Sequence, residues 1–217
     1  MLSWEAMGCS LETCPRSIDV KHGEPEMTDQ SDRSESLPTW ARIEAWLREN
    51  SRHGFSDLSG PASGVELAAL GSTTGLAVPE SMRAVLTVHD GQARPSIFGA
   101  EFDFLSSRQM AEHWRMHLAV LEHLPSEVLA GEFDPDVMVQ CDKGVRPLIA
   151  NRKWLPFADS NGDITRYIDF DPAPGGRVGQ VIEVDPEGTV WRVLASSFDE
   201  YLADRLRRLE AGEALLD

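Results

Sequence analysis

The stretch 154–198 shows the most regular alternation of apolar and polar residues in the chain. It reads WLPFADSNGDITRYIDFDPAPGGRVGQVIEVDPEGTVWRVLASSF, and Asn-Gly, Pro-Gly and Glu-Gly pairs interrupt it. Such alternation, cut by these turn residues, is typical of antiparallel strands joined by hairpins. The pattern predicts strands over 154–157, 164–170, 180–184 and 189–195. It then predicts a terminal helix, capped by Ser196 or Ser197, whose apolar residues share one face.

Helical spacing dominates the chain before residue 125. The first predicted helix begins at Leu37-Pro38-Thr39, because proline is favoured in the first turn of a helix. Its apolar stripe would consist of Trp40, Ile43, Trp46 and Leu47. Further helices are predicted over 63–71, 79–89 and 106–124. The order of the predicted elements is helices first, then a run of strands, then a last helix. This order predicts an α+β domain with an antiparallel meander sheet.

Residues 1–36 show neither helical nor strand periodicity and are rich in Glu, Asp, Ser and Pro. A segment of this composition buries too little apolar area to offset the entropy lost on ordering. We therefore predict a disordered acidic tail over 1–36 and a single α+β domain over 37–217. Met27 opens the run MTDQSDRSES and is a plausible start of the native protein, so nothing functional is assigned to residues 1–26.

The chain is strongly acidic, with 36 Asp and Glu against 20 Lys and Arg, a net charge of −16. Such a surface repels nucleic acid and anionic lipid, and it favours a basic protein partner. No apolar run approaches the roughly 20 residues that span a bilayer, so we predict no membrane association. The three cysteines, Cys9, Cys14 and Cys141, are few and odd in number, which suits a reducing compartment. We expect a cytoplasmic protein.

The common signatures of enzymes are missing from the sequence. It has no P-loop, no G-x-S-x-G elbow and no G-x-G-x-x-G after a strand. His113 and His117 are spaced by four residues and would share one helix face, but the sequence reads HWRMH instead of H-E-x-x-H. A chance pair on a partly exposed helix explains them better than a metal site. We predict no catalytic residue, no cofactor and no metal.

Four aspartates in the strand-rich stretch are the best candidates for a site: Asp159, Asp163, Asp169 and Asp171. Residues 159–163 (DSNGD) resemble the beginning of a calcium loop, but the residue eleven positions after Asp159 is a phenylalanine, not a chelating glutamate. Asp169 and Asp171 alternate along a strand and would point to one face, as paired carboxylates do. Aspartate is also a common turn former, and a scaffold role for all four stays the favoured alternative. If they have a function, they form a partner-binding surface.

A series of short motifs runs along the chain. They occur in order between residues 40 and 207, at 76–80 (LAVPE), 89–92 (HDGQ), 104–106 (FLS), 154–157 (WLPF), 161–163 (NGD), 168–172 (IDFDP), 179–182 (GQVI) and 195–198 (ASSF), with Trp114 on the long helix. Each motif is weak alone, whereas the ordered series is fairly specific and resembles the SUKH superfamily. The acidic tail and the long connector 125–144 depart from the pattern.

The resemblance implies an α+β fold without a known catalytic centre. Bacterial members of the superfamily look like immunity proteins that bind and neutralise toxins, and the yeast relative regulates cell-wall assembly. Our first hypothesis is therefore a non-catalytic immunity protein that binds a cognate toxin, for which a basic nuclease is one candidate. The alternative is a regulatory scaffold in cell-wall assembly or signalling.

Overall fold

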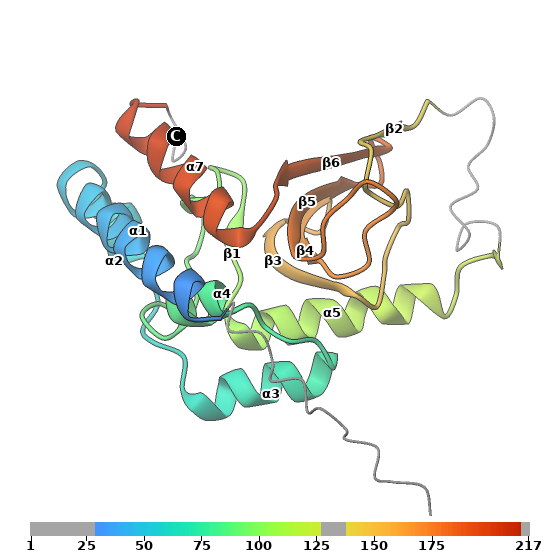
Figure 1. The fold of residues 1–217 in the computed structure, drawn as a ribbon, viewed down its shortest axis with the longest axis horizontal. Helices are drawn as coiled ribbons and strands as arrows, with labels where there is room; N and C mark the ends of the chain where they lie inside the picture. The colour runs from blue at the N-terminus through green and yellow to red at the C-terminus, as the bar shows by residue number, and fades with distance from the viewer. Residues whose placement is uncertain (1–28, 127–137, 214–217) are drawn as a thin grey trace, which may run out of the picture.

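The structure, a computed structural model, describes residues 29–126 and 138–213, and in 29–36 the backbone only (Figure 1). The helices are α1 (Asp29–Asn50), α2 (Arg52–Ser56), α3 (Gly64–Thr74), α4 (Glu80–Leu86), α5 (Ser107–Leu121) and α7 (Phe198–Glu210). The strands are β1 (Asp103–Phe104), β2 (Gln140–Cys141), β3 (Trp154–Ser160), β4 (Ile164–Asp169), β5 (Gln180–Asp185) and β6 (Val190–Ala195). This order of elements confirms the predicted α+β fold.

The six strands form one sheet in the order β1-β3-β4-β5-β6-β2. From β1 to β6 all neighbours are antiparallel, as the predicted meander requires. Strand β2 differs, because it pairs with β6 in parallel over two residues. This strand begins at Gln140 and extends the sheet beyond the predicted meander.

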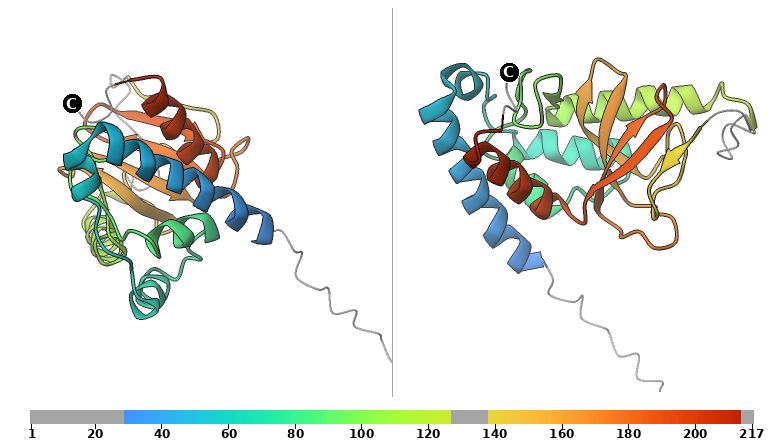
Figure 2. Two further views of the ribbon diagram at one scale, coloured as in Figure 1. Left: turned by 90° about the vertical axis from the view of Figure 1, so that its left-hand side faces the viewer. Right: turned by 90° about the horizontal axis from the view of Figure 1, so that it is seen from above.

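The helices lie around the sheet in two groups. Helix α1 packs against α4 and α7, and the three lie together at one end of the molecule (Figures 1 and 2). Helix α5 runs along the sheet, contacts β3, and carries α3 on its other side (Figure 1). Within the described part of the chain, no helix is both long and apolar enough to cross a lipid bilayer.

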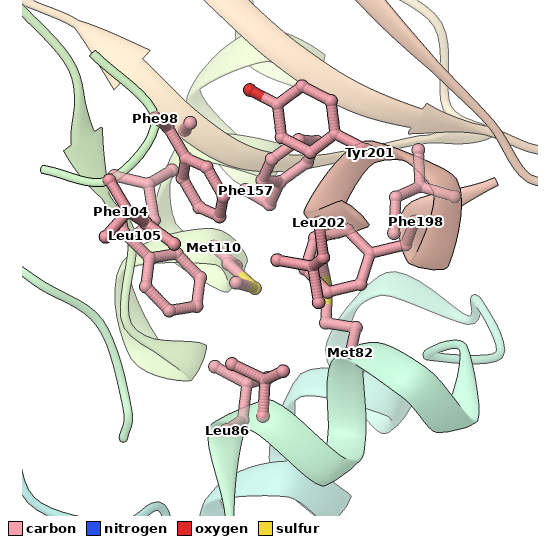
Figure 3. Packing of buried hydrophobic residues seen from close by; sticks show 14 of the residues in the cluster. Met82, Leu86, Phe98, Phe104, Leu105, Met110, Phe157, Phe198, Tyr201 and Leu202 are labelled. Carbon is pink, nitrogen blue, oxygen red and sulfur yellow. The ribbon is translucent and has the colours of Figure 1, made fainter. Parts of the chain in front are cut away.

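An aromatic cluster forms the centre of the main core, between the sheet and the helices (Figure 3). The ring of Phe98 lies 5.0 Å from Phe104 and 5.4 Å from Phe157 between centroids, both edge to face. Phe157 also packs edge to face on Phe198 and Tyr201 of α7. A bulge in β3 between Pro156 and Ala158 interrupts the register at Phe157. This cluster joins β3 to α7 and to the loop before β1.

A second, smaller apolar cluster covers the opposite face of the sheet. It consists of Val145, Trp154, Tyr167, Ile182, Val184 and Trp191. Neighbouring strand residues point to opposite faces, and accordingly Tyr167 belongs to this cluster while Ile168 belongs to the main core. Because both faces are covered, every residue of β3 is buried.

Three helices begin, close to the predicted positions, with a serine cap. Ser63 and Ser106 each form a capping box, with Glu66 and Gln109 as the third helical residue, and Ser197 caps α7. In each case a serine hydroxyl accepts a hydrogen bond from a backbone N–H that the helix leaves unpaired. These starts are confirmed.

The start of α1 differs from the prediction. The helix begins at Asp29, so Pro38 lies inside it and not in its first turn. Proline in a helix interior removes one backbone donor and crowds the preceding turn, and the prediction placed the helix start at Pro38 for this reason. Most of the predicted disordered tail, residues 1–28, lies outside the described residues, and its last eight residues are helical. The predicted domain limits stay a prediction.

Candidate functional site

The four candidate aspartates lie at the β3–β4 hairpin and at the far end of β4, in very different surroundings. Asp159 in β3 is 4% exposed and Asp169, the last residue of β4, is fully buried. Asp163 lies exposed in the hairpin turn, and Asp171 is half-buried in the loop after β4. The four therefore do not form one continuous acidic surface.

Asp169 holds three segments together through its carboxylate. Oδ1 accepts hydrogen bonds from Trp154 Nε1 (3.0 Å) and from the backbone N–H of Asp171 (2.8 Å). Oδ2 accepts one from Gln180 Nε2 (2.9 Å). Burial raises the pKa of Asp169 above its usual value, and these hydrogen bonds offset part of the rise. Asp169 thus ties the end of β4 to β3 and β5.

Asp159 stabilises the β3–β4 turn. Its carboxylate accepts hydrogen bonds from the backbone N–H of Gly162 (2.8 Å) and from the hydroxyl of Thr165 (2.9 Å). Asn161 and Gly162 have φ values of 55° and 87°, the left-handed pair that a type I′ hairpin turn requires. The hairpin predicted from Asn-Gly is confirmed, and Asp159 is part of its scaffold.

The other two aspartates reach solvent to different extents. Asp171 Oδ2 accepts a hydrogen bond from Asn151 Nδ2 (3.0 Å) and lies 3.3 Å from Arg146 Nε. Asp163 is exposed at the tip of the hairpin. The expected pair of Asp169 and Asp171 is not assembled as a catalytic dyad, because each carboxylate has its own partners. A partner-binding role stays a prediction, with Asp163 the most accessible of the four.

A pocket of about 160 Å³ lies beside Asp163, between α5 and the sheet. We call it the α5 pocket, and its lining includes His117, Val120, Ile149, Asp163, Tyr167 and Val184. On its wall the hydroxyl of Tyr167 lies 3.1 Å from His117 Nδ1. The pocket combines apolar walls with this one hydrogen-bonded pair and an acidic edge.

The polar pair in the α5 pocket is uncharged at neutral pH. Burial, helped by the charge of His113, lowers the pKa of His117 to about 4, while Asp159 opposes the shift. Burial also raises the pKa of Tyr167 well above its usual value. A histidine that stays neutral and a tyrosine that stays protonated can donate and accept hydrogen bonds, but neither is set to transfer protons near pH 7.

The histidine pair predicted on α5 is brought together without forming a metal centre. The rings of His113 and His117 lie perpendicular, 6.2 Å apart between centroids. His113 Nδ1 lies 3.8 Å from Asp159 Oδ1, a loose contact. Over residues 29–126 and 138–213, no group of three or more His, Cys, Asp and Glu side chains could hold a metal ion.

Two exposed apolar side chains lie on α5 at this side of the molecule. Met116 is 53% exposed and Val120, which lines the α5 pocket, is 44% exposed. Residues spaced by four are neighbours on a helix surface, so the two form one short ridge. Sequence reasoning missed this feature because the pocket is lined by segments far apart in the chain. The sequence signal that could have indicated this ridge is the four-residue spacing of Met116 and Val120. These two residues belong to a different part of α5 from the buried Met110 and Ala111.

The α+β fold with its meander sheet agrees with the SUKH class of domain that the ordered motifs above resemble. The sequence model of the SMI1 / KNR4 family (SUKH-1) matches residues 61–204, and the chain belongs to this family. The resemblance seen in the sequence is therefore confirmed.

Several fungal proteins are similar to the chain. "Cell wall biosynthesis/cell cycle regulator smi1" of Schizosaccharomyces pombe is 28% identical, over 85% of this chain and 39% of that protein. "Glucan synthesis regulatory protein" of Neurospora crassa is 23% identical, over 82% and 39%. "KNR4/SMI1 homolog" of Eremothecium gossypii is 21% identical, over 84% and 37%. The chain thus spans about two fifths of the length of these relatives. The names of the first two describe regulators and support the alternative hypothesis better than toxin immunity.

Proposed function

We propose that the chain is a non-catalytic, protein-binding regulator in cell-wall assembly or signalling. The observation that carries the proposal is the similarity over 85% of the chain to a protein named as a regulator of cell wall biosynthesis. The chain corresponds to only part of such regulators. We therefore assign it the part of their work that one domain performs, which is to bind another protein.

The geometry of the candidate site supports binding over catalysis. Asp159 and Asp169 are occupied by hydrogen bonds that hold turns and strands. His117 and Tyr167 are kept in their neutral forms by burial. Asp159 and Asp169 are buried, and the pKa values of His117 and Tyr167 are shifted away from neutrality, so these groups do not meet the requirements of acid–base chemistry.

The proposed docking surface is the α5 pocket with its ridge. An apolar side chain of the partner would enter beside Val120, and Asp163 at the edge would attract a basic residue. The net charge of −16 favours the same kind of partner. Opposite charges accelerate association and make it sensitive to salt.

A complementation experiment tests the regulatory role and the surface together. The gene is deleted in its source organism, and cell-wall polymer content and resistance to wall-degrading enzymes are measured. The wild type and the control Val65→Asp, a valine 80% exposed on α3, should restore the wall. Val120→Asp should not restore it. A deletion strain with a normal wall would contradict the regulatory role, and restoration by Val120→Asp would contradict the surface alone.

A second candidate function is immunity to a toxin, which the charge of −16 favours because many toxin domains that attack nucleic acid are basic. Co-expression with a toxin-like protein from a neighbouring gene tests it. Binding of the toxin-like protein by the chain, together with survival of the cells, supports immunity. A normal wall in the deletion strain would then favour immunity over the regulatory role. Both candidates assume the cytoplasmic location predicted from the sequence, which cell fractionation tests.

A further inference from the structure

One face of α7 forms a pocket that is distinct from the α5 pocket. Tyr201, Asp204, Arg205 and Arg208 are spaced as one helix face, and they enclose a space of about 210 Å³ together with Arg166 of β4 and Leu194 of β6. We call it the α7 pocket. Three of its six lining residues are arginines, an unusual concentration in a chain of net charge −16.

Arg166 is a structural member of the α7 pocket, because its donors are already used. Its Nε and Nη2 each lie 2.9 Å from Glu183 Oε2. Its Nη1 donates to the hydroxyl of Tyr201 (2.9 Å) and to the carbonyl oxygen of Phe98. The guanidinium also stacks on the ring of Phe102, 3.7 Å from the centroid. Arg166 therefore fixes one wall of the pocket and leaves ligand binding to the other arginines.

Arg205 is buried without its full set of partners. It is 8% exposed, and its Nε has no hydrogen-bond partner among the described residues. Its one ion pair joins Nη2 to Asp204 Oδ2 at 3.3 Å. A guanidinium keeps its charge and offers five N–H donors, and leaving such donors buried and unpaired is costly. Arg205 thus lines the α7 pocket with a guanidinium that has one buried, unpaired N–H.

The negative charge available in the α7 pocket is shared too widely to neutralise it. Asp204 pairs with Arg205, with Arg207 at 2.8 Å and with Arg208 at 3.0 Å. The pKa of Asp204 is lowered, because hydrogen bonds and charges of these arginines outweigh the opposing effect of burial. Arg208 also reaches Glu213, at 3.4 Å. A single carboxylate of the lining therefore serves three cations.

We propose that the α7 pocket binds an oxyanion, the phosphate or carboxylate group of a ligand, through Arg205 Nε and the guanidinium of Arg208. Planar guanidinium groups match the geometry of these anions and form short, charge-assisted hydrogen bonds with them. An anion there satisfies the unpaired donor of Arg205 and balances the excess positive charge. This activity goes beyond the proposed regulatory function and does not depend on it.

NMR of the full chain labelled with ¹⁵N at arginine tests the proposal directly. The Nε–Hε signal of Arg205 is assigned by its loss in Arg205→Lys, and it is followed while inorganic phosphate or acetate is added at constant ionic strength. A saturable shift with phosphate identifies a phosphate site, and one with acetate identifies a carboxylate site. A signal that stays in place with both anions, or that moves without saturation, overturns the proposal.

A matched pair of variants separates the pocket from general charge attraction. Arg208→Gln removes an arginine that lines the pocket, whereas Arg207→Gln removes one that pairs with the same Asp204 outside it. We expect Arg208→Gln to weaken anion binding about tenfold and Arg207→Gln less than about twofold. Thermal unfolding checks that both variants are folded. Equal effects of the two variants would overturn the site.

Discussion

The two faces of the sheet are stabilised in different ways. On the face covered by α1, α4 and α7, large aromatic side chains such as Phe98, Phe157 and Phe198 pack on one another. On the other face each large aromatic residue carries a polar partner. Trp154 donates a hydrogen bond to Asp169, and Trp191 Nε1 donates one to the carbonyl oxygen of Leu148 (2.8 Å). The hydroxyl of Tyr167 forms a hydrogen bond with His117.

The difference shows where the molecule is free to interact. Apolar packing on the helix-covered face depends on shape and excludes water. The opposite face depends on directed hydrogen bonds, and there the α5 pocket opens beside His117 and Tyr167. Changes in the aromatic cluster of the first face should therefore act on stability alone, whereas changes beside the α5 pocket should also respond to pH and to partners.

The largest effect is expected for Phe157→Ala, which leaves a cavity in the aromatic cluster. Removing a fully buried phenylalanine destabilises a protein by about 3–5 kcal/mol. Denaturant unfolding followed by circular dichroism measures the loss, and Phe157→Leu is the milder control. A loss below about 1 kcal/mol would show that this face does not depend on packing.

Asp169→Asn tests the polar face at nearly constant volume. The new amide replaces one acceptor oxygen, so one donor among Trp154 Nε1, Gln180 Nε2 and the Asp171 N–H loses its partner. We expect a loss of about 2–3 kcal/mol in the free energy of unfolding. A change as small as that of a surface substitution would contradict the scaffold role of this carboxylate.

The pH dependence of stability should report His117. Its pKa is about 4 in the folded state, below the ordinary value of 6.5, so the unfolded chain takes up this proton first as the pH falls. Stability from this residue is complete above pH 6.5 and declines between pH 6.5 and about 4, by about 3 kcal/mol. His117→Gln should flatten the decline, and the exposed His123→Gln should leave it unchanged. An unaltered profile in His117→Gln would refute this assignment.

The smallest effect on stability is expected for Asp163→Asn, at the exposed tip of the hairpin. The free energy of unfolding should change by less than about 0.5 kcal/mol. Binding of a basic partner at the α5 pocket should nevertheless weaken, most clearly at low salt. Calorimetric titration with an identified partner measures the affinity. An unchanged affinity in Asp163→Asn would show that Asp163 is not part of the docking surface.

Features that depend on a few adjacent residues could be predicted from the sequence. The serine caps at Ser63, Ser106 and Ser197 and the Asn161–Gly162 turn follow from local backbone and side-chain chemistry. Strands β3 to β6 followed from their alternation and turns, and so did the fold class.

Features that depend on distant segments could not be predicted. The buried carboxylate of Asp169 accepts hydrogen bonds from side chains 15 and 11 residues away in the sequence. The sequence alone indicates only a polar residue near a turn. The parallel pairing of β2 with β6 joins segments about 50 residues apart. Arg205 reads as part of a polar helix face, and only the approach of β4 and β6 to α7 encloses it.

The short strands at the two ends of the sheet protect the molecule against self-association. Both β1 and β2 contain two residues, and they cover part of the outer edges of β3 and β6. An exposed strand edge is a template on which another molecule can add its own strand, and short edge strands offer few free backbone groups for this. Where β1 and β2 pair with them, β3 and β6 offer no free backbone groups to a second molecule.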